Sequence, residues 1–148
     1  MLRKCSFAAV VFLFLSTLSL SAFADTYVSG CITTDTTWTT NNSPYVVTDD
    51  VMFGCGTLTI DPGVEVQFQD GEGMFIGSAN ELGCTCDPGA TQTYGTLVAD
   101  GTDQNHILFT SEEQPPAAGE KWGTLFFTSN SGYNVLDHCD ITNGGAVD

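Results

Sequence analysis

Two histidines and their neighbouring aspartates are the residues of this chain that could do acid–base chemistry. His138 stands between Asp137 and Asp140 in the run VLDHCDI, and His106 follows Asp103 by three positions. A histidine beside a carboxylate can act as a general acid or base. Successive residues of a strand point to opposite faces, so we expect His138 to share a face with Asp140 and not with Asp137. We favour a surface or structural role for both histidines, and we assign no catalytic residue.

The carboxylates suggest two further kinds of chemistry. Glycoside hydrolysis uses two carboxylates at a set separation, and calcium binds carboxylate and carbonyl oxygens. Asp-Gly and Asp-Pro-Gly sequences, such as those at Asp61, Asp70 and Asp100, form turns whatever else they do, so we favour a turn role for most of the candidate carboxylates. The Asp-Gly-Thr-Asp turn that contains Asp100 and Asp103 is the best candidate for a calcium site. We expect no other cofactor.

The cysteines are compatible with an exported, disulfide-containing protein. An odd number remains after the leader, so at least one thiol is unpaired, and Cys139 in its apolar strand pattern is expected to be a buried free thiol. Cys31 and Cys55 flank the first expected coil and are predicted to form a disulfide. Cys84 and Cys86 are too close for an easy mutual disulfide, and two thiolates could serve a metal, although no second pair has ligand spacing.

The first 24 residues have the pattern of a secretory signal peptide. Arg3 and Lys4 precede a mostly apolar run that ends in the A-x-A sequence at 22–24. The run is short for a bilayer span, so we expect no membrane span after cleavage. Cleavage would leave one lysine against 18 acidic residues, which changes the formal charge from −15 to −17. Such a surface repels nucleic acid and acidic polysaccharide. The prediction is a secreted or cell-surface protein.

Short strands between turns must position these residues. Apolar residues alternate with polar ones, and no segment after the signal peptide has helical periodicity. Two stretches, 78–94 and 111–120, interrupt the alternation and are expected to be loops. Strands are expected at 45–47, 51–53, 57–60, 64–68, 74–76, 95–99, 106–110, 122–128 and 135–141.

The phrase Gly-Thr-Leu occurs three times, at 56–58, 95–97 and 123–125. An antiparallel sandwich does not need such a repeat, whereas a coil of stacked parallel strands places each copy at an equivalent corner. Glycine would turn the corner and leucine would face inward, and inserted loops would account for the uneven spacing. The core is expected to contain Leu58, Ile60, Val64, Val66, Phe68, Leu97, Ile107, Phe109, Leu125 and Phe127.

The runs TTWTTNNSPYVVTDDV, GTLTIDPGVEVQF, GTLVADGTDQNHILFTS and WGTLFFTSNSGYNVLDHCDITNGG resemble the first coils of secreted right-handed parallel β-helix repeat proteins of the pectin-lyase-like superfamily. The resemblance covers most of residues 33–145 except the 78–94 loop. It implies an all-β solenoid, short or truncated, with an N-terminal cap at 25–50, coils over 51–148 and a loop insertion at 78–94. An uncapped last coil would be free to associate end to end with another chain.

The aromatic residues bear on function. Trp122 and Tyr133 could stack on sugar rings if exposed, and Trp38 is expected to plug the N-terminal end of the coil. Superfamily lyases typically use a basic residue and often calcium, but the mature chain has one lysine and no arginine. We therefore expect a non-catalytic structural or binding module that contacts carbohydrate or cell-surface components. The alternatives are the N-terminal part of a polysaccharide lyase or glycoside hydrolase, and a calcium-stabilised structural module.

Overall fold

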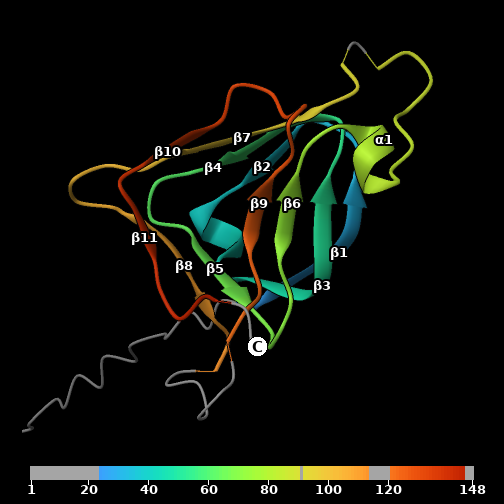
Figure 1. Ribbon diagram of the computed structural model, residues 1–148. Coiled ribbons are helices and arrows are strands. Elements are labelled where there is room, and N and C mark those ends of the chain that lie inside the picture. Colours follow the sequence, from blue (N-terminus) through green and yellow to red (C-terminus); the bar gives the residue numbers. More distant parts are fainter. Residues whose placement is uncertain (1–23, 91, 114–120, 146–148) are drawn as a thin grey trace, which may run out of the picture.

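The computed structural model describes residues 24–90, 92–113 and 121–145. Within them the chain is mostly β, and its parallel sheets curl into a half-barrel (Figure 1). Every ladder between two named strands is parallel. Residues 1–23 of the expected signal peptide lie outside the described residues, so that prediction stays open.

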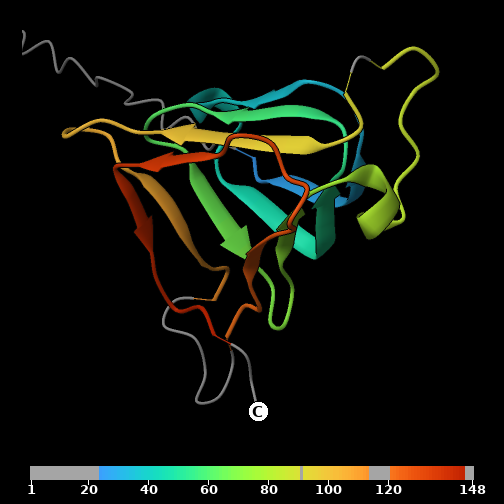
Figure 2. The same ribbon diagram turned by 45° about the horizontal axis from the view of Figure 1, so that its top comes forward.

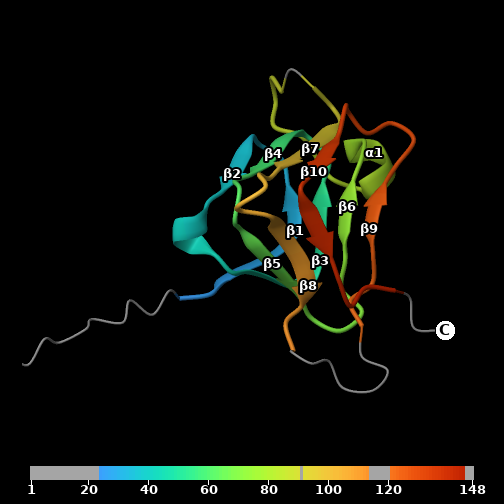
Figure 3. The same ribbon diagram turned by 90° about the vertical axis from the view of Figure 1, so that its left-hand side faces the viewer.

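The strands form a larger and a smaller sheet, which meet along the corners of the half-barrel (Figures 2 and 3). The larger sheet has the order β11-β8-β5-β3-β6-β9, with β1 beside β3, and the smaller has the order β10-β7-β4-β2. The larger sheet contains β1 (Thr26–Ile32), β3 (Tyr45–Phe53), β5 (Glu65–Phe68), β6 (Met74–Ile76), β8 (Ile107–Ser111), β9 (Leu125–Phe127) and β11 (Cys139–Ile141). The smaller contains β2 (Thr36–Trp38), β4 (Gly56–Ile60), β7 (Gly95–Asp100) and β10 (Val135–Asp137).

The first two Gly-Thr-Leu phrases occupy equivalent places, as expected. Gly56 pairs with Gly95, and Leu58 with Leu97, in the ladder between β4 and β7. Gly56 has a φ of +81°, and a Cβ on Gly95 would overlap the carbonyl oxygen of Phe53, so both corners require glycine. The third phrase is not equivalent, and that prediction was wrong. Its Leu125 lies in β9 of the larger sheet, opposite Met74.

The expected strands are found with four differences. The strand expected at 122–128 is shorter, because β9 contains only Leu125–Phe127. Residues 25–50 supply β1 and β2, which the turn-rich sequence concealed. The expected strands at 45–47 and 51–53 are a single strand, β3. The expected strand at 135–141 is two strands separated by His138. The left-handed backbone of His138 (φ +47°) takes the chain from β10 of the smaller sheet to β11 of the larger sheet.

One apolar core runs between the two sheets. Eight of the ten expected core residues are buried, while Leu125 and Phe127 are partly buried against the same cluster. Trp38 lies in the outermost strand of the smaller sheet, 2% exposed and stacked on Tyr45 at 4.6 Å, which agrees with its expected place at the N-terminal end. The alternation of the sequence therefore identifies the inward faces correctly.

The 78–94 insertion contains a short helix that the sequence analysis missed. Helix α1 (Ala79–Leu82) begins after Ser78, whose hydroxyl accepts a hydrogen bond from the Glu81 N–H at 3.2 Å. It ends at Gly83, which has a left-handed φ of +70°. Ser78 and Glu81 have the spacing of a capping box, so the signal was present but too short to show helical periodicity. A single 3-10 turn, η1 (Thr40–Asn42), follows β2.

Two disulfides fix this insertion to the sheets, and the predicted Cys31–Cys55 pairing is wrong. Cys31 pairs with Cys84, and Cys55 pairs with Cys86. Cys31 lies on the outer face of β1 and Cys55 is buried just beyond β3, and the insertion passes over both positions. Cys84 and Cys86 are consumed by these bonds, which removes the metal alternative for the Cys-Thr-Cys sequence. Cys139 is the free thiol, as expected, but only partly buried.

The last strands leave core-facing residues uncovered. Ile141 pairs with Phe109, and Leu136 pairs with Ala99, so all four face inward. The two residues of the earlier layer are 0% exposed, whereas Ile141 is 51% and Leu136 is 38% exposed. Among the described strands, β9, β10 and β11 each have a ladder on one side only. This end of the half-barrel is therefore apolar and has free backbone edges.

Candidate functional site

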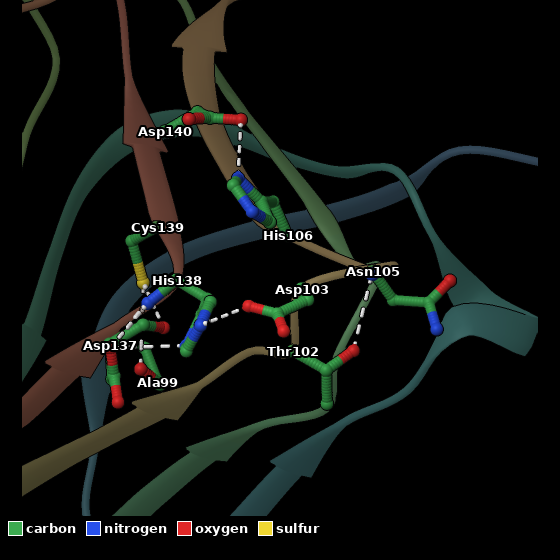
Figure 4. Close-up of polar contacts among 9 residues, drawn as sticks. All are labelled: Ala99, Thr102, Asp103, Asn105, His106, Asp137, His138, Cys139 and Asp140. Carbon is green, nitrogen blue, oxygen red and sulfur yellow. Dashed lines mark hydrogen bonds and ion pairs between the residues drawn. The ribbon is translucent and has the colours of Figure 1, made fainter.

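Five polar residues gather where the chain passes from the smaller to the larger sheet, and we call them the histidine–aspartate corner: Asp103, His106, Asp137, His138 and Asp140 (Figure 4). Two layers contribute to it. The earlier layer turns between β7 and β8, through an antiparallel bridge between Thr102 and Asn105. The later layer turns through His138 alone, between β10 and β11. Because β10 lies on β7 and β11 lies on β8, the two corners are stacked.

Two contacts connect the layers in opposite directions. His138 of the later layer has its Nε2 2.9 Å from Asp103 Oδ1 of the earlier layer. His106 of the earlier layer has its Nδ1 3.1 Å from Asp140 Oδ2 of the later layer. The two imidazole rings meet edge to face, with their centres 5.8 Å apart. Each layer therefore contributes one histidine and one carboxylate to these two contacts.

Backbone N–H groups of the earlier layer hold the His138 corner in place. The carbonyl of His138 accepts a hydrogen bond from the Ile107 N–H at 3.0 Å, and the carbonyl of Asp137 accepts one from the Gly101 N–H at 2.9 Å. A Cβ on Gly101 would lie 2.6 Å from the His138 carbonyl oxygen, so glycine is needed under this corner. A left-handed backbone costs a non-glycine residue about 1–2 kcal/mol. These contacts offset that cost.

The expectation that Asp137 and His138 could not lie on one face was wrong. His138 contacts Asp137, not Asp140: the Asp137 Oδ1 accepts a hydrogen bond from the His138 N–H at 2.9 Å and lies 3.1 Å from its Nδ1. The contact between Asp137 Oδ1 and His138 Nδ1 lacks hydrogen-bond geometry. Nδ1 is therefore buried without a hydrogen-bond partner among the described residues. The rule that neighbours face opposite ways holds within a strand, and the left-handed corner at His138 breaks the strand.

The histidine–aspartate corner contains a histidine oriented by a carboxylate, but the cysteine beside it is not a suitable nucleophile. Asp103 orients the His138 ring as an acid orients a catalytic base. The adjacent thiol of Cys139 is unsuited as the nucleophile. Its Sγ donates to the carbonyl oxygens of Asp137 at 3.3 Å and Ala99 at 3.4 Å. Burial, followed by the nearby carboxylates, raises the pKa of Cys139 and disfavours the reactive thiolate.

The predicted calcium site gains no support. Asp103 directs its carboxylate at His138, and Asp100 is the last residue of β7, paired in register with Asp137. No group of three or more histidine, cysteine, aspartate or glutamate side chains within residues 24–90, 92–113 and 121–145 is arranged to hold a metal ion. Calcium binding at Asp100 and Asp103 stays a prediction.

The two expected sugar-stacking residues differ completely in exposure. Trp122 is 2% exposed and stacks on Phe68 with ring centres 4.4 Å apart, while its indole N–H donates to the Thr142 carbonyl at 2.7 Å. It is a core residue, and its predicted role was wrong. Tyr133 is 88% exposed in the loop between β9 and β10 and is free to contact a ligand.

Two open pockets lie away from the histidine–aspartate corner, and no sequence pattern predicted either of them. The first, about 240 Å³, is lined by Phe68, Gln69, Asp70, Ser111, Glu112, Glu113 and Lys121. The second, about 420 Å³, lies where the 78–94 insertion passes the start of β4, and Asp35, Asp87 and Gln92 are among its lining residues. Neither is lined by a residue of the histidine–aspartate corner.

Comparison of the chain with models of protein families, with curated proteins and with solved structures found no match. Among the residues that the structure describes, no helix is long and apolar enough to cross a membrane.

Proposed function

We propose that this chain is a non-catalytic module of a right-handed parallel β-helix, secreted or on the cell surface, that contacts carbohydrate. The parallel pairing supports the β-helix. Along the chain, β2, β4, β7 and β10 stack in that order in the smaller sheet, and β5, β8 and β11 stack in the larger one. Between two successive strands of one stack, the chain forms strands of the other sheet or of the other branch of the larger sheet. This is the path of a coil that passes three faces per turn.

The single observation that carries the non-catalytic proposal is the mutual engagement of the corner residues. Both histidines contact carboxylates of the neighbouring layer, at 2.9 and 3.1 Å, on an exposed corner. Groups that bond to one another across layers contribute to the register of those layers. A contact between histidine and aspartate would also suit a catalytic base, but the second ring nitrogen of His138, Nδ1, is buried 3.1 Å from Asp137 Oδ1 and is not presented to a substrate.

Export is supported by the two disulfides, since disulfides persist mainly in oxidising compartments. The acidic surface argues for a neutral partner and against nucleic acid or polyuronate. Tyr133 is the most exposed large hydrophobic side chain of the described residues and supplies a flat ring for stacking.

The test uses residues 25–148, expressed with oxidised disulfides. With calcium present, pectate should give no rise in ultraviolet absorbance from unsaturated product. On a panel of immobilised neutral oligosaccharides the protein should bind, and Tyr133→Ala should weaken that binding. Tyr27→Ala is the matched control, because Tyr27 is also exposed (63%) but lies on β1. A steady absorbance rise that is lost in His138→Ala would overturn the non-enzyme proposal.

The uncovered apolar end supports a second proposal, that a second copy of the chain associates there. Inward-facing Leu136 and Ile141 and the free edges of β10 and β11 would be covered by another layer of strands. The alternative, an N-terminal part of a carbohydrate-active enzyme, is favoured by the same end, since further catalytic coils of one polypeptide would cover it equally well.

A further inference from the structure

The two disulfides of the 78–94 insertion join residues of different exposure. Cys31 is exposed and lies on β1, which pairs with β3 alone among the described strands, and its partner Cys84 is 7% exposed. In the second disulfide, Cys55 is 1% exposed and Cys86 is half-buried. Thiol–disulfide exchange requires an incoming thiolate to reach one of the two sulfurs, so its rate depends on access. The Cys31–Cys84 bond is therefore the more accessible of the two.

The segment from Ala79 to Cys84, which contains helix α1, lies over Cys55, and we call it the covering segment. It packs directly on the end of β3, because a Cβ on Gly54 would lie 2.9 Å from the Cα of Ala79 and 3.0 Å from the Cβ of Cys84. Cys55 is buried in one small cluster with Ala79 and Cys84. A reductant can thus reach Cys55 only after the covering segment has moved.

The covering segment is separate from the main core. The main apolar cluster between the two sheets contains none of the four disulfide-bonded cysteines, whereas the small cluster contains both Cys55 and Cys84. The base of the insertion is held by the backbone as well, since the Gly95 N–H donates to the Gly77 carbonyl at 2.7 Å. Displacement of the covering segment is therefore a local opening that leaves the core in place.

Movement of the covering segment would expose a further member of an apolar row. Met52, Phe75 and Phe126 are paired in register across β3, β6 and β9. Their neighbours within these strands pack in the core, so the three side chains lie on the outer face. Phe126 is 50% exposed, whereas Met52 packs against the small cluster beneath the covering segment. Displacement would therefore extend the exposed apolar surface from β9 and β6 to β3.

We propose that the Cys31–Cys84 disulfide is a redox-sensitive switch: its reduction releases the covering segment, while the Cys55–Cys86 disulfide keeps the insertion attached. The reductant is a dithiol. One of its thiolates attacks the Cys31 sulfur, and Cys84 leaves as a thiolate that takes up a proton. The second thiol of the reductant then displaces Cys31 from the mixed disulfide. The protein gains two electrons and two thiols, and the reductant becomes a disulfide. This proposal goes beyond the carbohydrate contact and does not depend on it.

The order of reduction is the first test. Oxidised protein, residues 25–148, is treated with the neutral dithiol dithiothreitol under native conditions, alkylated at intervals and digested for mass spectrometry. Cys31 and Cys84 should become alkylated at least tenfold faster than Cys55 and Cys86. Earlier reduction of the Cys55–Cys86 bond, or equal rates for the two bonds, would overturn the proposal.

Hydrogen exchange tests whether the covering segment is released. The Leu82 N–H donates to the Ser78 carbonyl at 3.1 Å, and the Cys84 N–H donates to the Ala79 carbonyl at 2.8 Å. When only the Cys31–Cys84 bond has been reduced, both amides should exchange at least tenfold faster, while the amides of β4 and β7 keep their rates. Unchanged exchange at Leu82 and Cys84 would show that the bond does not control the segment. Loss of protection in β4 and β7 would show global unfolding instead of a switch.

Two double variants reproduce the states without a reductant. Cys31→Ser/Cys84→Ser should bind a neutral apolar dye several-fold more strongly than the oxidised wild type does, and adding Met52→Gln should reduce that gain. The matched control Cys55→Ser/Cys86→Ser keeps the Cys31–Cys84 bond and should bind the dye as the wild type does. Circular dichroism checks that each variant is folded. Equal dye binding by the two folded double variants would contradict a specific role for Cys31–Cys84.

Discussion

The imidazole of His138 lies 2.9 Å from the carboxylate of Asp103, a residue 35 positions earlier. The contact joins two successive corners of the chain, one that needs a six-residue turn (101–106) and one made by a single residue. The His138 side chain therefore connects the two layers at the residue where the later layer has a left-handed backbone. This relationship makes the corner the place where substitutions can separate backbone strain from side-chain contact.

Replacing His138 tests that separation. We expect His138→Ala to lower the free energy of unfolding by about 0.2–1 kcal/mol, because alanine keeps the left-handed strain that histidine already bears and loses only the exposed contact with Asp103. His138→Gly should cost clearly less, since glycine adopts a φ of +47° without strain. Urea unfolding measures both. Equal losses would show that the left-handed corner is not a source of strain.

His106→Ala is the matched control for that pair. His106 makes the reciprocal contact with Asp140 at 3.1 Å, but it lies at an ordinary strand start. An exposed contact of this kind is worth about 0.2–1 kcal/mol, so His106→Ala should cost about as much as His138→Ala, and glycine at position 106 should give no gain over alanine.

Replacing Glu72 should change how stability depends on pH. Burial, and next the charges of Asp50 and Asp49, raises the pKa of Glu72 in the folded protein. A raised folded pKa means that the native state favours the protonated acid. Its stabilising contribution is thus full at acid pH and is lost as pH rises through the folded pKa. Glu72→Gln should therefore raise the Tm slightly at pH 7, and the difference should shrink as the pH falls through the ordinary range of a glutamate pKa. A uniform difference at all pH values would contradict this explanation.

The disulfide pairing can be mapped directly. Digestion without reduction should release one cluster in which the peptide containing Cys84 and Cys86 is joined to the Cys31 and Cys55 peptides, and fragmentation between Cys84 and Cys86 in the mass spectrometer should assign Cys31 to Cys84 and Cys55 to Cys86. The separations of 53 and 31 residues correspond to roughly 4 kcal/mol for each bond alone in the chain-entropy model. The double variant Cys55→Ser/Cys86→Ser should accordingly melt at a distinctly lower temperature. A peptide joining Cys31 to Cys55 would contradict the structure.

The free thiol of Cys139 should be slow to alkylate. Burial raises its pKa, so at pH 8 a smaller fraction is thiolate than in an ordinary cysteine. We expect iodoacetamide to modify the folded protein several-fold more slowly than it modifies reduced glutathione. In urea without a reductant the two rates should converge. A fast reaction of the native protein would identify an activated thiol and reopen a nucleophilic role for the corner.

Association through the apolar end should depend on salt. The strong negative charge opposes contact between two copies, and raising the salt from about 0.1 M to 1 M shortens the screening length from about 10 Å to about 3 Å. Sedimentation should show dimers at high salt for the wild type and monomers for Leu136→Ser/Ile141→Ser. Phe126→Ser is the control, because Phe126 is 50% exposed on the outer face of β9. Dimers that persist in the double variant would place the interface elsewhere.

The alternation of apolar residues was sufficient to predict the inward faces and most strands, because that pattern reflects burial directly. The Gly-Thr-Leu repeat also predicted the pairing of Gly56 with Gly95. It failed at Gly123, since the phrase recurs in a different face and a local sequence does not encode which strand lies beside it.

The features that the sequence could not predict depend on contacts between distant segments. Cys84 and Cys86 reach their partners only because the insertion passes over β1 and the end of β3. Trp122 stacks on Phe68, a distant residue that the local sequence around Trp122 does not identify. The contact of His138 with Asp103 follows from the stacking of two corners, and the left-handed residue there looks in sequence like the middle of one strand.

Strand β3 (Tyr45–Phe53) has a consequence for how the chain finds its alignment. Its first residues pair with β5, and its last residues pair with β6, while β1 runs along the opposite edge. A one-residue slip of β3 would therefore misalign three ladders together and turn Val47, Val51 and Phe53 away from the core. One continuous strand thus serves as a common reference for both branches of the larger sheet, and an error in placing it cannot remain local.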